Sequence, residues 1–257
     1  MKTHTPFFNY AISAASLVDI GFKRTSNQDE VILCPETGFY AVSDGMGGLL
    51  HGGETSQMIK QVLPEMIKNA INDLLKDPSP EYAAKLLSEQ VRMLSDNIYD
   101  TCNKGNYFSF GATLSSVWFV GYHAVFVNLG DSRGYLLPRH AKKIQQVTHD
   151  HDVATLLVDQ GEITKEEARH HPASSSLTRF VGMDVPARPE AFIRKVNQGD
   201  RILLCSDGLH GMVEDSVFAS VMRFSENPKR ICAQFVEKAN ANGGRDNISV
   251  VYIKIEK

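Results

Sequence analysis

The spacing of hydrophobic residues changes twice along this chain, and that change restricts the fold more than any other feature of the sequence. Before residue 44, short apolar runs bounded by turn residues predict three strands, at residues 10–21, 30–33 and 39–43. From Glu54 to Lys76 the apolar residues recur every three or four positions, which predicts a helix. Pro80 then begins a second predicted helix, because proline suits the first helical turn.

The two-residue period returns after residue 110 and predicts a second group of strands. Residues 111–137 contain three of them, separated at Gly121-Tyr122 and at Gly130-Asp131, and strand character continues in KKIQQVTHDH. We interpret the polar segment over about 148–185 as a flap insertion with short helices near 153–160 and 165–170. Further strands are predicted at 191–196, 200–208 and 247–257, and helical spacing at 213–222 and 228–240.

The order of these segments predicts a single α+β domain over residues 1–257, because the chain has no repeats and no Pro/Ser-rich linker. Antiparallel strands must bury one face, so we expect helices to cover two stacked sheets.

The composition argues against several classes of protein. The net charge is −3, and no Lys/Arg block indicates binding to nucleic acid or to a membrane surface. No apolar run approaches the ~20 residues of a membrane helix, and polar residues interrupt the N-terminal apolar segment, which argues against a signal peptide. We therefore expect a cytoplasmic protein whose separated cysteines are buried packing residues; they are Cys34, Cys102, Cys205 and Cys232.

Four aspartates lie at the ends of predicted strands, each beside Gly or Asn. They are Asp44 in SDGMGG, Asp131 in GDSRG, Asp207 in SDGLHG and Asp246 in GGRDN. Each motif alone is explained by a turn. If the strands are neighbours at one edge, however, the carboxylates converge there, and like charges that close cannot all stay ionised without a cation.

Carboxylates with small neighbours suit a hard divalent ion such as magnesium, manganese or calcium. A glycine such as Gly45 leaves its carbonyl oxygen open to such an ion, because no side chain blocks the approach. The spacing of an EF-hand is absent, so the sequence does not support a calcium loop.

Seven motifs follow one another between about residues 14 and 253: GFKRTSNQD, VSDGMGG, FGATL, NLGDSRGYLL, SLTRFVG, DRILLCSDGL and GGRDNISVVYI. In this order they resemble the metal-dependent serine/threonine protein phosphatases, the PPM or type 2C family, in its compact bacterial form. The resemblance implies a four-layer α/β/β/α sandwich with two central antiparallel sheets. It also implies a protein-serine/threonine phosphatase that uses two to three manganese or magnesium ions.

The resemblance assigns metal-binding roles to individual residues. Asp44 matches the carboxylate that bridges two metal ions, and Gly45 matches the carbonyl ligand beside it. Asp207 and Asp246 match the other carboxylates of this binuclear site. Asp131 matches the ligand of a third, weaker metal, which Asp207 would share.

Two further residues match supporting roles. Asp29 corresponds to an acidic residue that supports the metal site through water, and Arg24 to the arginine that binds the substrate phosphate. Two metal ions can lower the pKa of a shared water and hold it in line with phosphorus. A guanidinium offers paired donors that match phosphate oxygens. No C-x5-R loop is present, so the cysteines have no catalytic role in this interpretation.

The histidines are where this chain departs from the pattern of the family. Met46 stands where eukaryotic relatives have the histidine thought to protonate the leaving oxygen, so His51 and His210 become alternative proton donors. Exposure or packing explains each of the two equally simply. Four flap histidines lack a clean zinc-ligand spacing, and we expect a solvated loop there; they are His149, His151, His170 and His171.

Three functions remain open at this point. The first is a monomeric phosphatase acting on phosphoserine and phosphothreonine proteins and opposing a bacterial Ser/Thr kinase. The second is a catalytically silent, phosphoprotein-binding adaptor, although such a relative would be expected to lack Asp44, Asp207 or Asp246, and all are present. The third is a hydrolase of small phosphoesters with the same metal site and a different groove.

Overall fold

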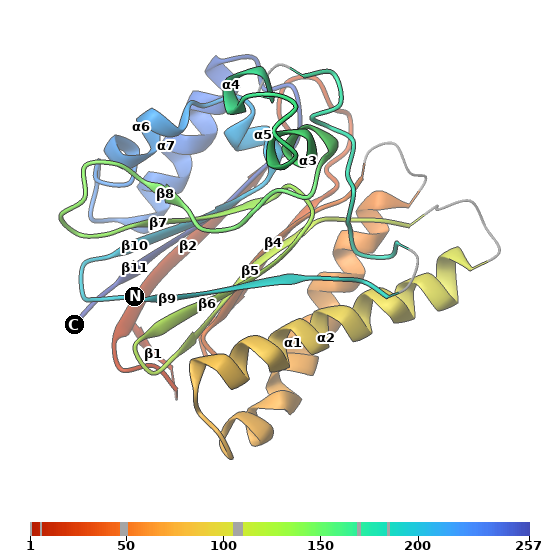
Figure 1. Cartoon of the computed structure of the whole chain (residues 1–257). Coiled ribbons are helices and arrows are strands. Elements are labelled where there is room, and N and C mark those ends of the chain that lie inside the picture. The colour runs from red at the N-terminus through yellow and green to blue at the C-terminus, as the bar shows by residue number, and fades with distance from the viewer. Residues whose placement is uncertain (1, 6, 47–50, 105–109, 169–170, 184–185) are drawn as a thin grey trace.

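The computed structural model describes residues 2–5, 7–46, 51–104, 110–168, 171–183 and 186–257 (Figure 1). In this part of the chain, two antiparallel sheets stack face to face. The first contains, in spatial order, β1 (Thr3–His4), β2 (Ala11–Asp19), β11 (Ile248–Ile255), β10 (Arg201–Cys205), β7 (Arg133–Leu137) and β8 (Gln145–Gln146). The second contains β3 (Asp29–Cys34), β4 (Phe39–Asp44), β5 (Leu114–Val120), β6 (His123–Leu129) and β9 (Glu190–Lys195).

Helices cover the outer face of each sheet. The second sheet packs against α1 (Gly52–Leu74) and α2 (Pro80–Ile98), which η1 (Tyr99–Asn103) extends. The first sheet packs against α5 (Asp207–His210), α6 (Asp215–Val221) and α7 (Pro228–Ala241), as Figure 1 shows. The predicted α/β/β/α sandwich is therefore confirmed. No helix in the described ranges has both the length and the apolarity needed to cross a bilayer.

The burial of β5 shows why its sequence reads as a nearly continuous apolar run. All seven of its residues are buried. Trp118 faces the layer of α1 and α2, whereas the next residue, Phe119, packs between the two sheets. Alternate residues of a strand point to opposite faces, so a strand covered on both sides needs apolar residues at every position.

The second long helix begins where the sequence signals predict, and the first begins two residues before the predicted Glu54. Ser79 caps α2 by accepting a hydrogen bond from the backbone N–H of Tyr82 at 3.2 Å, and Pro80 is the first helical residue. The segment between β8 and β9 contains α3 (Val153–Asp159) and α4 (Lys165–Ala168), near the positions predicted for the flap helices.

Two sequence expectations were wrong in detail. The strand predicted over 200–208 ends at Cys205, because Asp207 begins the one-turn helix α5, which is too short to show a helical period. Cys102 is only half-buried, whereas the other three cysteines are buried as predicted. It lies in η1, where Asn103 is the one buried residue, so the turn at the end of α2 does not enclose the thiol.

Candidate active site

Asp29 and Asp44 lie opposite each other at one end of the second sheet. Asp29 is the first residue of β3, Asp44 is the last residue of β4, and the register pairs their Cα atoms. The backbone N–H of the next residue, Gly45, donates to the carbonyl of Gln28 at 3.0 Å. The two carboxyl groups therefore leave the sheet side by side.

Three other aspartates reach the same edge from the first sheet. Cys205, the last residue of β10, is paired with Arg133, the first residue of β7, and with Val250 near the start of β11. Residues just beyond these strand ends are therefore neighbours; they are Asp131, Asp207 and Asp246. This register brings together the aspartates that the turn motifs predicted to converge.

The electrostatics of the cluster show how closely the carboxyl groups lie. Burial, followed by the charges of Asp29, Asp207 and Asp131, raises the pKa of Asp44 well above its usual range. Burial raises the pKa of Asp29 to about 7. Burial and the neighbouring charge of Asp246 raise the pKa of Asp207, and burial and the charge of Asp207 raise that of Asp131. A bound cation would remove this penalty, because it favours the ionised carboxylates.

Two further observations test whether these residues fit a divalent cation. Asp29 Oδ1 and Asp207 Oδ1 are buried and have no hydrogen-bond partner among the described residues. Such oxygens are costly unless a ligand or a water satisfies them. A Cβ atom on Gly45 would lie 2.4 Å from the carbonyl oxygen of Gly52 and 2.7 Å from that of Gln28, so glycine is required for packing. The donor set therefore fits a hard divalent ion, which binds carboxylate and carbonyl oxygens.

Arg24 lies at the same edge and is exposed. Its Nη2 donates to Asp246 Oδ2 at 2.6 Å, and this hydrogen bond raises the pKa of the guanidinium. Asn247 holds the loop between β2 and β3 that carries Arg24. Its Oδ1 accepts from the N–H of Gln28 at 2.8 Å, and its Nδ2 donates to the carbonyl of Ser26 at 3.0 Å.

The sequence reasoning missed two residues that hold the aspartates. Thr113 forms hydrogen bonds with both backbone polar groups of Asp44. Its Oγ1 accepts from the N–H of Asp44 at 3.1 Å, and its own N–H donates to the carbonyl of Asp44 at 2.8 Å. Ser206 Oγ donates to Asp29 Oδ2 at 2.8 Å. Both residues lie within motifs that are visible in the sequence, FGATL and DRILLCSDGL. Their hydrogen-bond partners are distant in sequence, so the motifs alone did not indicate these roles.

The two candidate proton donors differ in their surroundings. His210 Nε2 lies 3.0 Å from the carbonyl oxygen of Asp131, to which it can only donate, and burial holds its pKa well below the usual value. His51 is partly exposed; its ring stacks on Phe110 at 4.4 Å between centroids, and its Nδ1 lies 2.9 Å from Glu54 Oε1. Because the proton of neutral His210 is committed to that carbonyl, His51 is the better candidate of the two for a proton donor.

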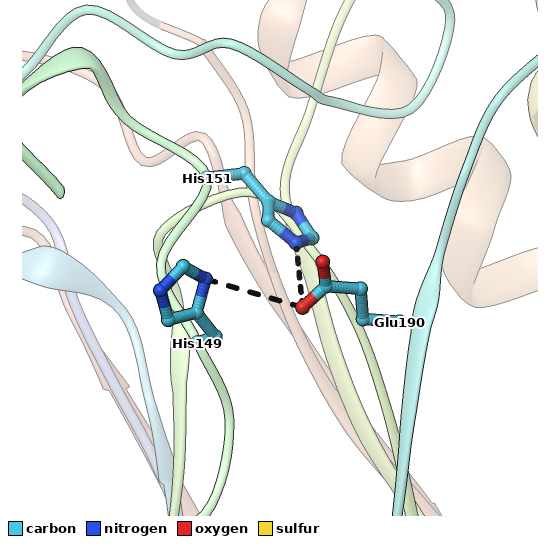
Figure 2. A group of neighbouring side chains, drawn as sticks. All are labelled: His149, His151 and Glu190. Carbon is cyan, nitrogen blue, oxygen red and sulfur yellow. Dashed lines mark ion pairs between the residues drawn. The ribbon is translucent and has the colours of Figure 1, made fainter. Parts of the chain in front are cut away.

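The flap histidines do not share one solvated loop, as the sequence suggested. His149 and His151 meet Glu190 of β9, with Nδ1 and Nε2 at 3.9 Å and 3.5 Å from Glu190 Oε2 (Figure 2). His151 is 3% exposed, so the expectation of solvation was wrong for this residue, because the fold packs it against β9. His171 Nδ1 accepts from the N–H of Ala173, and His170 lies outside the described residues, as do the glycines at 47 and 48.

Comparison with known proteins leads to one family. The family model described as Protein phosphatase 2C matches residues 23–239. The serine/threonine phosphatase stp of Listeria monocytogenes is 30% identical over 236 residues, which cover 91% of this chain and 87% of that protein. The crystal structure of the Mycobacterium tuberculosis serine/threonine phosphatase PstP/Ppp matches with a TM-score of 0.81 at 31% identity, over 96% of this chain and 99% of that one. The catalytic domain of PstP in complex with two manganese ions matches with a TM-score of 0.77 at 30% identity, again over 96% and 99%.

Proposed function

The chain belongs to the protein phosphatase 2C family and is a protein-serine/threonine phosphatase, and from that premise we propose that it hydrolyses phosphoserine and phosphothreonine with a binuclear metal centre at the aspartate cluster. The observation that carries the proposal is the meeting of carboxyl groups from both sheets at one edge, where two buried oxygens have no hydrogen-bond partner among the described residues. A catalytically silent adaptor would not need to maintain that costly arrangement.

The proposed ligands follow from the position of each group. Asp44, Asp207, Asp246 and the carbonyl of Gly45 would hold two manganese or magnesium ions. Asp131, together with Asp207, would hold a third. When bound, such ions supply a water of lowered pKa and offset the charge of the phosphate. Oxygen ligands discriminate weakly between magnesium and manganese, and a solved relative contains manganese.

The side chains around the cluster have their own tasks. Asp29 would support the centre through a water, since one of its oxygens is already held by Ser206. Arg24 would bind the substrate phosphate, because its side chain is 40% exposed and places only one hydrogen bond on Asp246. The remaining N–H groups of the planar guanidinium match the oxygens of a phosphate.

We also propose that the flap over about 148–185 borders the substrate groove. Val181 forms an isolated bridge with Ala112, and Ala112 forms another with Gly45, so Ala112 connects the flap to the Gly45 side of the cluster. Phosphoproteins, including a cognate Ser/Thr kinase, are the proposed substrates of a monomeric, cytoplasmic enzyme.

Hydrolysis of a phosphothreonine peptide, compared in manganese and in EDTA, tests the proposal. We expect phosphate release that requires manganese and is lost in Asp44→Asn, Asp207→Asn and Asp246→Asn, each of which still unfolds cooperatively. No release by folded wild-type protein from several phosphopeptides would support the adaptor instead. Release from p-nitrophenyl phosphate but from no phosphopeptide would support a hydrolase of small phosphoesters.

A further inference from the structure

The turn that carries Asp131 is held by a residue of the flap. The backbone N–H of Gly130 donates to His151 Nδ1 at 3.1 Å, and the N–H of His151 donates to the carbonyl of Gly130 at 3.0 Å. One residue therefore satisfies both polar backbone groups of the glycine that precedes Asp131. Gly130 has a φ of +114°, a conformation that few other residues adopt, so the turn depends on such contacts to keep its shape.

The hydrogen bond from Gly130 also determines where His151 carries its proton. Burial lowers the pKa of His151 to about 4, so the ring is neutral at physiological pH. Because Nδ1 accepts the Gly130 N–H, the single ring proton must lie on Nε2. That atom is directed at the Glu190 carboxylate, 3.5 Å from Oε2, as Figure 2 shows. Glu190 is fixed in turn by Arg179, whose Nη1 donates to its other oxygen at 2.8 Å.

The same tautomer argues against a metal ion in this cluster. Ligand atoms of His149, His151 and Glu190 lie within 4.8 Å of one another, which is close enough for shared coordination. A protonated Nε2 has no lone pair to offer, however, and its Nδ1 is already an acceptor. The cluster is therefore a polar contact between the flap and β9, in which the buried His151 Nε2 faces Glu190 Oε2 at 3.5 Å without a hydrogen bond among the described residues.

The Asp131 turn is held on its other side as well. His210 Nε2 contacts the carbonyl oxygen of Asp131 at 3.0 Å, so two histidines hold consecutive residues of the turn. The carbonyl of His151 accepts from the N–H of Thr178 at 2.8 Å, which connects the same residue to the later part of the flap. His151 thus contacts the Asp131 turn, the flap and β9 at once.

We propose that His151, oriented by Glu190, is a positioning residue that sets the direction of the Asp131 carboxylate and so tunes the weaker, third metal site. The inference rests on the proposed function, since Asp131 is a ligand only if the cluster binds metal. His151 does not touch the substrate or the metals; it acts through the Gly130 backbone. Residues that orient metal ligands typically change metal affinity when they are replaced.

Manganese titration by isothermal calorimetry, with His151→Ala and His151→Asn, tests this inference. His151→Ala should weaken the third site roughly 10–100-fold and leave the two tighter sites unchanged. The Asn side chain keeps an acceptor close to the position of Nδ1, so His151→Asn should restore most of the affinity. His140→Asn, at an exposed histidine, is the control and should match the wild type.

A double variant separates positioning from general damage to the fold. In an Asp131→Ala background the third site is already lost, so adding His151→Ala should change neither manganese binding nor turnover further. An unchanged third site in His151→Ala, or an equal loss at all sites, would overturn the inference. If His151→Ala does not fold, Glu190→Gln serves instead, with a smaller but selective weakening of the third site expected. If wild-type protein binds no manganese, the proposed function itself is wrong, and the inference falls with it.

Discussion

Replacing Asp29 by asparagine should stabilise the metal-free protein, although it alters a group that the proposed function needs. The pKa of Asp29 is about 7 in the folded protein, against 3.8 for an ordinary aspartate, chiefly because the side chain is buried. A carboxyl group with a raised folded-state pKa binds more protons in the folded than in the unfolded chain. Stability is therefore lost as the pH rises from about 4 to about 7.

The size of the effect follows from the two pKa values. A difference of about 3 pKa units, at about 1.4 kcal/mol each, costs the folded protein about 4 kcal/mol above pH 7. At pH 5 the solution is only about 1.2 pH units above the pKa of an ordinary aspartate, so ionisation of Asp29 costs the folded protein about 2 kcal/mol. Asparagine has nearly the same shape and can still accept the hydrogen bond from Ser206 Oγ. It cannot ionise, so the variant avoids the cost.

Urea unfolding followed by circular dichroism in EDTA, at pH 8 and at pH 5, measures both values. Asp29→Asn should raise the free energy of unfolding by about 4 kcal/mol at pH 8 and by about 2 kcal/mol at pH 5. Asp77→Asn is the matched control, because Asp77 is exposed, and it should change stability by less than about 0.5 kcal/mol. Equal or lower stability of Asp29→Asn at pH 8, or a gain that does not depend on pH, would refute the reasoning.

Three other predictions concern single groups at the edge of the sheets. Arg24→Ala should raise KM for a phosphopeptide more than it lowers kcat, whereas Lys23→Ala, at the exposed neighbour, should do neither; steady-state kinetics compare them. Gly45→Ala should destabilise the protein by roughly 1–3 kcal/mol in urea unfolding, because its Cβ would meet the Gly52 carbonyl at 2.4 Å. His51→Gln should slow hydrolysis of a phosphoserine peptide but not of p-nitrophenyl phosphate, whose leaving group needs no proton; equal rates on the peptide would remove His51 as the donor.

The fold was predictable because its elements are long and strongly patterned. The strands and helices follow the two hydrophobic periods, and all of β5 is buried because it is covered on both faces. The one-turn helix α5 was not predictable, since four residues carry no period and its first residue looks like a turn aspartate. The exposure of Cys102 depends on how η1 ends the second helix, which composition does not report.

The residue types of the candidate site could be predicted from the sequence, but the residues that hold the aspartates in place could not. The aspartates are visible because glycine or asparagine marks each strand end. Their meeting depends on pairing β10 with both β7 and β11, which no local signal encodes. Thr113, Ser206 and His151 went unrecognised because each acts through hydrogen bonds to residues far away in sequence or on another element.

Two of the connections between the sheets bring functional residues to this edge. The chain passes from the first sheet to the second between β2 and β3, where Arg24 lies, and returns from the second to the first between β6 and β7, where Asp131 lies. Asp44, by contrast, is the last residue of β4 and is paired with Asp29 in the ladder to β3. The flap reaches the Asp131 turn through the side chain of His151, and it reaches Gly45 through the isolated bridges of Ala112. In the proposed centre, the third metal position would therefore be the part that responds to the flap through His151, and the selective loss expected for His151→Ala follows from that contact.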